Sequence, residues 1–335
     1  MYKKYYQNYL ATNPTGYNFS TTSEVDFPDF SYIESKIAMN DFDLYARATK
    51  LITKILNISQ KSQVHFFKNT TDSISAILEI HSHKKKISLL TSDSELLDLS
   101  GFFTNTEIII TKIPLMPFDN FNDRLIQLIQ KEQFDIIFLS QIFYNSGMIL
   151  QNIDNILKYI NFTCTQFILD GNRAFMHKAC NLSQYGNEIF YIASARDFFG
   201  DDISILISPL DLKTNLNPAS LMRVINVLEL INNNQIKIED IDSYMQTLQK
   251  NFRDELITID HFYLAEKNII NIDYRNHGHF YTFALPSSEV VKKLVNYLEL
   301  NYIKVDQIGS RLKINFKLYQ DTHFDLSFLK NHRKI

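Results

Sequence analysis

Cysteine is scarce in this chain: Cys164 and Cys180 are the only two among 335 residues. So few cysteines exclude a disulfide framework and a cysteine-rich zinc site. Long apolar runs are absent as well, and without about 18 consecutive apolar residues no transmembrane helix is expected. The first ten residues, MYKKYYQNYL, are basic but lack the apolar centre of a secretory signal. These absences together predict a cytoplasmic protein.

An excess of charge of either sign is also missing. Lys and Arg number 34 and Asp and Glu number 37, which gives a formal net charge of −3. Such a balance supplies no general attraction to nucleic acid or to an anionic membrane, so neither is expected as a partner. Hydrophobic residues make up 45% and charged residues 21%, which is the composition of a chain that folds.

Seven short apolar runs follow one another between residues 64 and 207, with amphipathic helical patterns among them, one of which runs from Ile149 to Ile160. Continuous apolar runs of this length are typical of parallel strands that are buried on both faces. The sequence therefore predicts an α/β fold with a mostly parallel seven-stranded sheet sandwiched by helices. The expected strands lie at 64–67, 87–90, 107–113, 134–140, 167–170, 189–193 and 203–207.

The pattern changes after about residue 215, where helices and strands no longer alternate regularly. We expect an N-terminal arm at 1–45, a large domain at 46–215 and a small C-terminal α+β domain at 216–335. The elements expected in the small domain are a helix that Asn217-Pro218 opens and that reaches Ile231, helices at 236–253 and after Ser287, and strands at 280–283 and 312–318.

Polar residues stand where several of the predicted strands end. Thr70, Ser140, Asp170 and Ser194 each follow or close an apolar run. In open α/β sheets, ligands bind at the carboxyl ends of the strands, so these residues are candidates for a site. Asp170 could hold a cationic ring nitrogen, a metal or a sugar hydroxyl, or it could only cap the next turn.

The stretch Asn69-Thr70-Thr71-Asp72 lies at the start of a predicted helix. The free amides and the dipole of a helix N-terminus attract anions such as phosphate. No glycines are present to form a P-loop, and simple capping by Thr70 or Thr71 explains the pattern equally well.

Two histidine pairs, His81 with His83 and His277 with His279, have a spacing that would suit a metal ion if they lay on a strand. No nearby cysteine or carboxylate completes a set of ligands. We therefore expect surface or turn histidines and no metal site.

Five short stretches occur in the same order as in a known family, and they are spread over most of the chain. The sequence resembles fold-type I pyridoxal-phosphate (PLP) enzymes of the class V aminotransferase group, and within it the kynureninase-like branch. The stretches are Phe67–Asp72, Phe138–Gly147 (similar to LSQVFFNSG), Leu169–Met176 (similar to VDGYHGFM), Phe190–Ala193 and Gly309–Tyr319 (similar to GDRLRFGFGLY).

The resemblance implies a homodimer in which PLP acts as an electron sink while bound to a lysine as a Schiff base. Asp170 would then hold the pyridine nitrogen, and Thr70 and Thr71 would contact the phosphate. Arg173 and Ser194 stand at the remaining positions expected to contact the cofactor.

The position of the family's lysine is changed in this sequence. Aligned on the stretch that begins at Phe190, the lysine position is occupied by Asp197, or by Arg196 after a shift of one residue. Neither side chain offers a primary amine, so neither can form the Schiff base. Lys178 is too close to Asp170 in the sequence to be a good substitute.

Other polar positions differ too. Arg173 replaces a family histidine, residues 22–29 lack the family's histidines, and Lys313 replaces the arginine that holds a substrate carboxylate. Lysine is a point charge where arginine is a bidentate fork, so recognition of the substrate should differ. Lys313 and Arg311 are nevertheless the candidate substrate-binding residues.

Three hypotheses remain open on the sequence alone. The chain is a non-catalytic homologue that binds a small anionic or amino-acid-like ligand or a partner. Alternatively, it is an enzyme that uses PLP or pyridoxamine phosphate non-covalently, acting on an amino acid as an aminotransferase, lyase or hydrolase. In the third hypothesis it is a structural or regulatory subunit that pairs with an active homologue.

Overall fold

The computed structural model describes the chain from residue 41 onward, with several internal gaps. The described residues are 41–95, 107–195, 203–214, 216–217, 220–270, 277–301, 303, 305–316, 324 and 326–332. The predicted N-terminal arm therefore lies almost entirely outside them.

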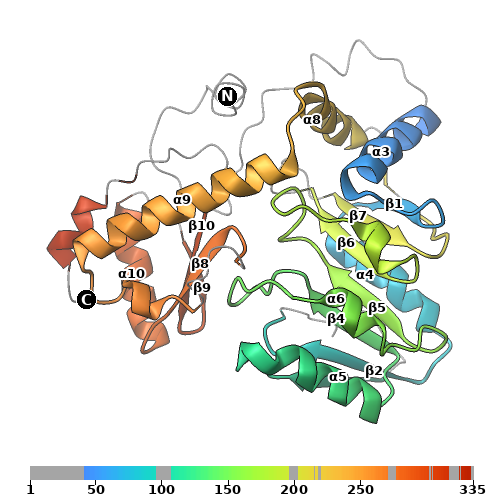
Figure 1. Ribbon diagram of the computed structural model, residues 1–335, viewed down its shortest axis with the longest axis horizontal. Coiled ribbons are helices and arrows are strands. Elements are labelled where there is room, and N and C mark those ends of the chain that lie inside the picture. The colour runs from blue at the N-terminus through green and yellow to red at the C-terminus, as the bar shows by residue number, and fades with distance from the viewer. Residues whose placement is uncertain are drawn as a thin grey trace.

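Seven strands form one large sheet in the order β1-β7-β6-β5-β4-β2-β3 (Figure 1). Strand β7 runs antiparallel to both of its neighbours, β6 and β1, and all other pairings are parallel. The predicted mostly parallel seven-stranded sheet is thus confirmed. The strands are β1 Gln63–Phe67, β2 Lys86–Ser92, β3 Glu107–Ile113, β4 Ile136–Ser140, β5 Gln166–Asp170, β6 Phe190–Ser194 and β7 Ser204–Ser208.

Successive side chains of each strand point to opposite faces, and both faces of the sheet are covered. In β4, Ile136 and Phe138 join the core on the α4 face, whereas Ile137 and Leu139 join the larger core on the opposite face. This double burial explains why the strands read as continuous apolar runs. The helices that accompany this sheet are α3 Asp41–Leu56, α4 Thr70–Leu78, α5 Phe121–Lys131, α6 Ile153–Leu157 and α8 Leu221–Asn233.

A second, antiparallel sheet of three strands has the order β8-β10-β9 and a core of its own. Its strands are β8 Phe280–Ala284, β9 Asp306–Ile308 and β10 Arg311–Asn315, and its helices are α9 Ile238–Ile259 and α10 Ser288–Leu300. Ser287 caps α10, because its hydroxyl accepts a hydrogen bond from the amide of Val290. Figure 1 shows α9 extending from the large sheet to the small one. Helix α8 packs with α3 in the core of the large sheet.

Three local expectations need correction. Helix α4 is capped by Asn69, whose side chain accepts from the amide of Asp72, and not by Thr70 or Thr71. The apolar pattern from Ile149 to Ile160 predicts one helix, but only the five residues of α6 are helical, because Ile149 instead forms a β-bridge with Ile142. Helix α9 is also longer than the pattern indicates.

None of the helices in the described ranges is long and apolar enough to cross a membrane.

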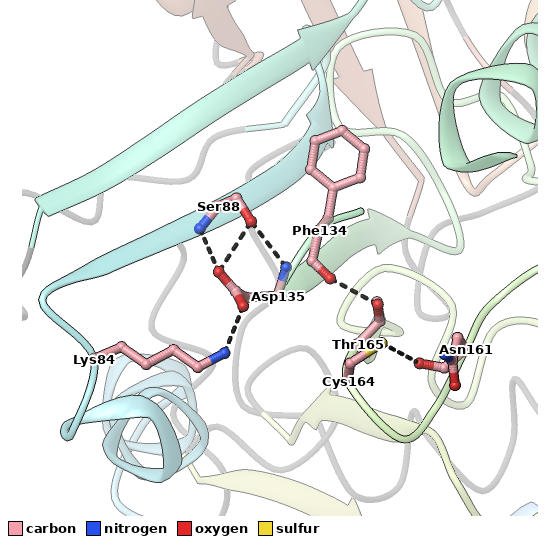
Figure 2. A network of polar contacts seen from close by, with 7 residues as sticks. All are labelled: Lys84, Ser88, Phe134, Asp135, Asn161, Cys164 and Thr165. Carbon is pink, nitrogen blue, oxygen red and sulfur yellow. Dashed lines mark hydrogen bonds and ion pairs between the residues drawn. The ribbon is translucent and has the colours of Figure 1, made fainter. Parts of the chain in front are cut away.

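A polar network fixes the end of the sheet at which β2 and β4 begin (Figure 2). The Asp135 carboxylate accepts hydrogen bonds from the Ser88 amide at 2.7 Å and the Ser88 hydroxyl at 2.9 Å. The Lys84 amine lies 2.5 Å from the other carboxylate oxygen. Burial acts to raise the pKa of Asp135, but these donors outweigh it and lower the pKa. The hydroxyl of Thr165 adds a hydrogen bond to the carbonyl of Phe134.

Replacing Asp135→Asn should lower the free energy of unfolding by about 1–3 kcal/mol, because charge-assisted hydrogen bonds are lost. The loss should be full near neutral pH and should shrink as the pH falls through the depressed pKa of Asp135. Urea unfolding at several pH values measures it. Asp119→Asn, an exposed change, is the control and should have little effect. Equal small losses in both variants would contradict the role of the network.

Candidate ligand crevice at the carboxyl edge of the sheet

The polar strand ends meet at one edge of the large sheet, as the sequence predicts. Ser140 ends β4 and Asp170 ends β5, and the two are register partners. The amide of Gln141 donates to the carbonyl of Asp170 at 2.8 Å. Ser194 ends β6 and faces Ser204 at the beginning of β7. Three of the predicted site residues are therefore fixed by backbone pairing.

Helix α4 begins at the same edge. The Ser73 hydroxyl donates to the Ser204 hydroxyl at 2.8 Å, which ties the first turn of the helix to β7. The side-chain oxygen of Asn69 accepts a hydrogen bond from the amide of Asp72. The amides of Thr70 and Thr71 have no acceptor within the helix, so they are available to an anion.

Asp170 is partly exposed, and its chemistry depends on its burial and on two neighbours. One carboxylate oxygen accepts from the Asn172 amide at 2.8 Å. Burial raises the pKa of Asp170 to about 6, although the Asn172 amide and the Arg173 charge act to lower it. Asp170 is therefore mostly ionised at neutral pH and can hold a cationic ring nitrogen.

Glu95 is a buried acid that the sequence reasoning missed. Its side chain is 8% exposed, and its carboxyl accepts from the amide of Ser140 at 2.8 Å and from the Ser140 hydroxyl. Burial, together with the negative charge of Asp170, raises the pKa of Glu95 to about 8, although the hydrogen bonds from Ser140 act to lower it. Glu95 is therefore mostly protonated at neutral pH. Strand β2 runs to Ser92, two residues beyond the predicted strand, so a correct strand end would have pointed to Glu95.

Lys313 reaches the crevice from the small sheet and is fully buried. Its amine lies 4.0 Å from the ring centroid of Tyr144 and 3.8 Å from that of Phe280. The Arg173 guanidinium carbon lies 5.1 Å from the same Tyr144 ring. Cation–π contacts thus gather Arg173 and Lys313 around one aromatic ring that follows β4. Binding of substrate by Lys313 stays a prediction.

The histidines at 277 and 279 are not on the surface, so that expectation was wrong. The Gly278 amide donates to the carbonyl of Gly147 at 2.8 Å, which draws this segment between the two sheets. The ring of His279 stacks on that of His177 at 3.7 Å, and the ring of His277 fills the space beside Gly147.

His81 is also buried, whereas His83 is exposed as expected. Within the described part of the chain, no cluster of three or more His, Cys, Asp or Glu side chains could hold a metal ion.

Some of the remaining candidates lie outside the described residues, and the others are held by contacts of their own. Asp197, Arg196 and residues 22–29 lie outside the described residues. The amine of Lys178 lies 2.6 Å from the Asp242 carboxylate on α9, so it is held in an ion pair. The Arg311 guanidinium donates to the backbone carbonyl of Asn145 at 3.1 Å.

Glu95→Gln should change how stability depends on pH. Because the folded-state pKa of Glu95 is raised from 4.5 to about 8, its contribution is full at low pH and is lost as the pH rises through 8. Between pH 5 and 8 the wild type should lose about 3 kcal/mol relative to Glu95→Gln, which stays neutral. Urea unfolding across this range measures the difference. The exposed change Glu188→Gln should follow the wild type, and parallel profiles for all three proteins would contradict the assignment.

Comparison with solved structures finds the same fold at low sequence identity. A cysteine desulfurase from Thermococcus onnurineus NA1 is 13% identical with a TM-score of 0.67, over 91% of this chain and 88% of that one. A cysteine desulfurase of Escherichia coli is 15% identical with a TM-score of 0.67, over 89% and 86%. A C-DES mutant with glycine covalently linked to its PLP cofactor is 12% identical with a TM-score of 0.67, over 90% and 89%.

A search of curated proteins finds no match to this sequence. These structural similarities show the fold and leave the kynureninase-like branch a prediction. The profile of the class V aminotransferases, in contrast, matches residues 34–223, which is more than half of the chain. The chain therefore belongs to the class V aminotransferase family.

Proposed function

We propose that this protein is a class V aminotransferase homologue that has lost Schiff-base chemistry and binds a small anionic or amino-acid-like ligand in the crevice. The sequence at the end of β6 carries this proposal. After Ser194 it continues Ala195-Arg196-Asp197, and no lysine occurs between Lys178 and Lys213. The segment that should present the amine therefore has none.

Two other amines lie near enough to be considered. Lys178 is held by Asp242, which directs its amine toward α9. Lys313 is buried against the rings of Tyr144 and Phe280. Leaving either set of contacts would cost free energy, because both are formed away from bulk water.

A second function, non-covalent use of PLP or pyridoxamine phosphate in reactions of an amino acid, is favoured by the residues that surround the crevice. The Asp170 carboxylate suits a protonated pyridine nitrogen, and the amides of Thr70 and Thr71 suit a phosphate. The donor set thus fits the ring and the phosphate of the cofactor, and only the amine is missing. When bound, the cofactor supplies an electron sink, which Asp170 would support by keeping the ring cationic.

An amino-acid-like ligand agrees with the structural relatives. Two of them are named for activity on cysteine, and in the C-DES mutant glycine is linked to the cofactor. A cytoplasmic homodimer is part of the proposal, as the family resemblance implies. A regulatory subunit of an active homologue would instead purify together with that homologue.

Treatment with PLP and then borohydride tests the proposal. The wild type should give no pyridoxyl-lysine peptide by mass spectrometry, because no amine stands at the position after β6. The matched variants Asp197→Lys and Arg196→Lys restore an amine at the two aligned positions. At least one of them should acquire a pyridoxyl group at the new lysine.

A pyridoxyl group on any lysine of the wild type, Lys313 included, would contradict the proposal. The non-covalent alternative is separated by thermal unfolding with saturating PLP or pyridoxamine phosphate. A ligand that binds only the native state must raise the midpoint, so an increase without a covalent adduct supports that alternative. An unchanged midpoint counts against it.

A further inference from the structure

A cavity of about 300 Å³ lies where the small sheet meets the carboxyl edge of the large sheet. Asp93 and Ser94 line it from the segment after β2, and Asn145 lines it from the turn after β4. Arg311, at the beginning of β10, lines it from the small sheet. Residues far apart in the sequence therefore converge on one cavity, which is partly open to solvent.

Two of the residues that line the cavity each have a buried side-chain polar atom without a hydrogen-bond partner. These are the hydroxyl oxygen of Ser94 and the side-chain oxygen Oδ1 of Asn145. Ser94 is only 3% exposed, so water does not easily satisfy it from bulk solvent. A buried polar group without a partner costs about 1–3 kcal/mol, and such groups in native proteins are usually explained by a ligand or a special role. A ligand that donates hydrogen bonds would satisfy both atoms.

The cavity also contains one charge of each sign. Arg311 uses one N–H for the carbonyl of Asn145, and its fork of five donors leaves others for a carboxylate. One carboxylate oxygen of Asp93 accepts from the Leu115 amide at 2.8 Å. Among the described residues, Arg311 and Asp93 form no ion pair with each other or with a third side chain. A ligand with both charges would match them better than a simple anion.

Apolar residues from both sides also line the cavity, next to Ser146 and Ser310. Leu115 and Met116 follow β3, and Ile270 and Ile308 belong to the small-sheet side. An apolar group of the ligand would remove this surface from water, at roughly 25 cal/mol for each Å² buried.

We infer that this cavity binds a zwitterionic amino acid with an apolar side chain. Arg311 holds its carboxylate, and Asp93 and the side-chain oxygen of Asn145 accept from its ammonium group. Ser94 hydrogen-bonds to the same ligand. The inference deepens the proposed function and rests on its claim that the chain binds an amino-acid-like ligand. It places that ligand at Arg311 and not at Lys313, which does not line the cavity.

Calorimetric titration of the full chain without added cofactor tests the inference. The probes are L-leucine, 4-methylpentanoate, which lacks the ammonium group, and 3-methylbutylamine, which lacks the carboxylate. L-leucine should bind, and each truncated probe should bind at least about tenfold more weakly, because one charge-assisted contact is lost. If 4-methylpentanoate binds as tightly as L-leucine, the cavity is a simple carboxylate site, and the claim that its ligand is a zwitterion is overturned.

Variants locate the binding. Arg311→Gln should weaken the binding of L-leucine about tenfold or more, and Ser94→Ala should weaken this binding by a smaller factor. Lys292→Gln removes an equal charge from an exposed position of α10 and should leave binding unchanged. Arg311→Lys, checked for folding by thermal unfolding, keeps the charge but loses the fork and should also bind more weakly. If L-leucine binds all variants as tightly as it binds the wild type, the inference is overturned. It is also overturned if L-leucine does not bind the wild type.

The outcome is separable from that of the proposed function. Because no cofactor is present, a pyridoxyl-lysine in the borohydride experiment would overturn the loss of Schiff-base chemistry without touching the leucine result. Absence of leucine binding together with absence of an adduct would overturn only the assignment of this cavity.

Discussion

Two acids, Glu95 and Asp170, lie at the carboxyl edge of the large sheet, and their burial sets the chemistry of the crevice because it raises the pKa of both. Two carboxylates in a poorly solvated place cannot both ionise easily. The hydrogen bonds from Ser140 favour ionised Glu95, but burial outweighs them and keeps Glu95 protonated. Asn172 and Arg173 favour ionised Asp170. At neutral pH the pair therefore carries about one negative charge, which lies on Asp170 and faces the crevice.

The turn after β4 joins this edge to the small sheet. Tyr144 contacts Lys313, the carbonyl of Asn145 accepts from Arg311, and Gly147 leaves room for His277. Gly147 has a φ of 77°, where a side chain is disfavoured, and a Cβ there would lie 2.2 Å from the imidazole. The position of the small sheet thus depends on a short turn of the large one, and the cavity at Arg311 is formed by the same contact.

Much of the architecture could be predicted because parallel strands buried on both faces leave an unmistakable apolar pattern. The position of Asp170 at the carboxyl edge of the sheet could also be predicted, since it directly follows an apolar run. Glu95 is missed, because the predicted strand ends two residues before the end of β2 and because tertiary contacts, not the hydrophobic pattern, bury this acid. The burial of His277 and His279 depends on pairing with Gly147, more than 100 residues away in the sequence. Likewise, Ile149 fits a helical pattern but pairs with Ile142.

The central claim is that the crevice has kept the groups for a ring nitrogen and a phosphate while losing the amine that binds the cofactor covalently. A crystal structure of the wild-type protein grown with excess PLP tests it most directly. The account predicts no continuous electron density between the cofactor's aldehyde carbon and the side-chain nitrogen of any lysine, whether or not cofactor density lies beside Asp170. Continuous density from the cofactor to a lysine would contradict it.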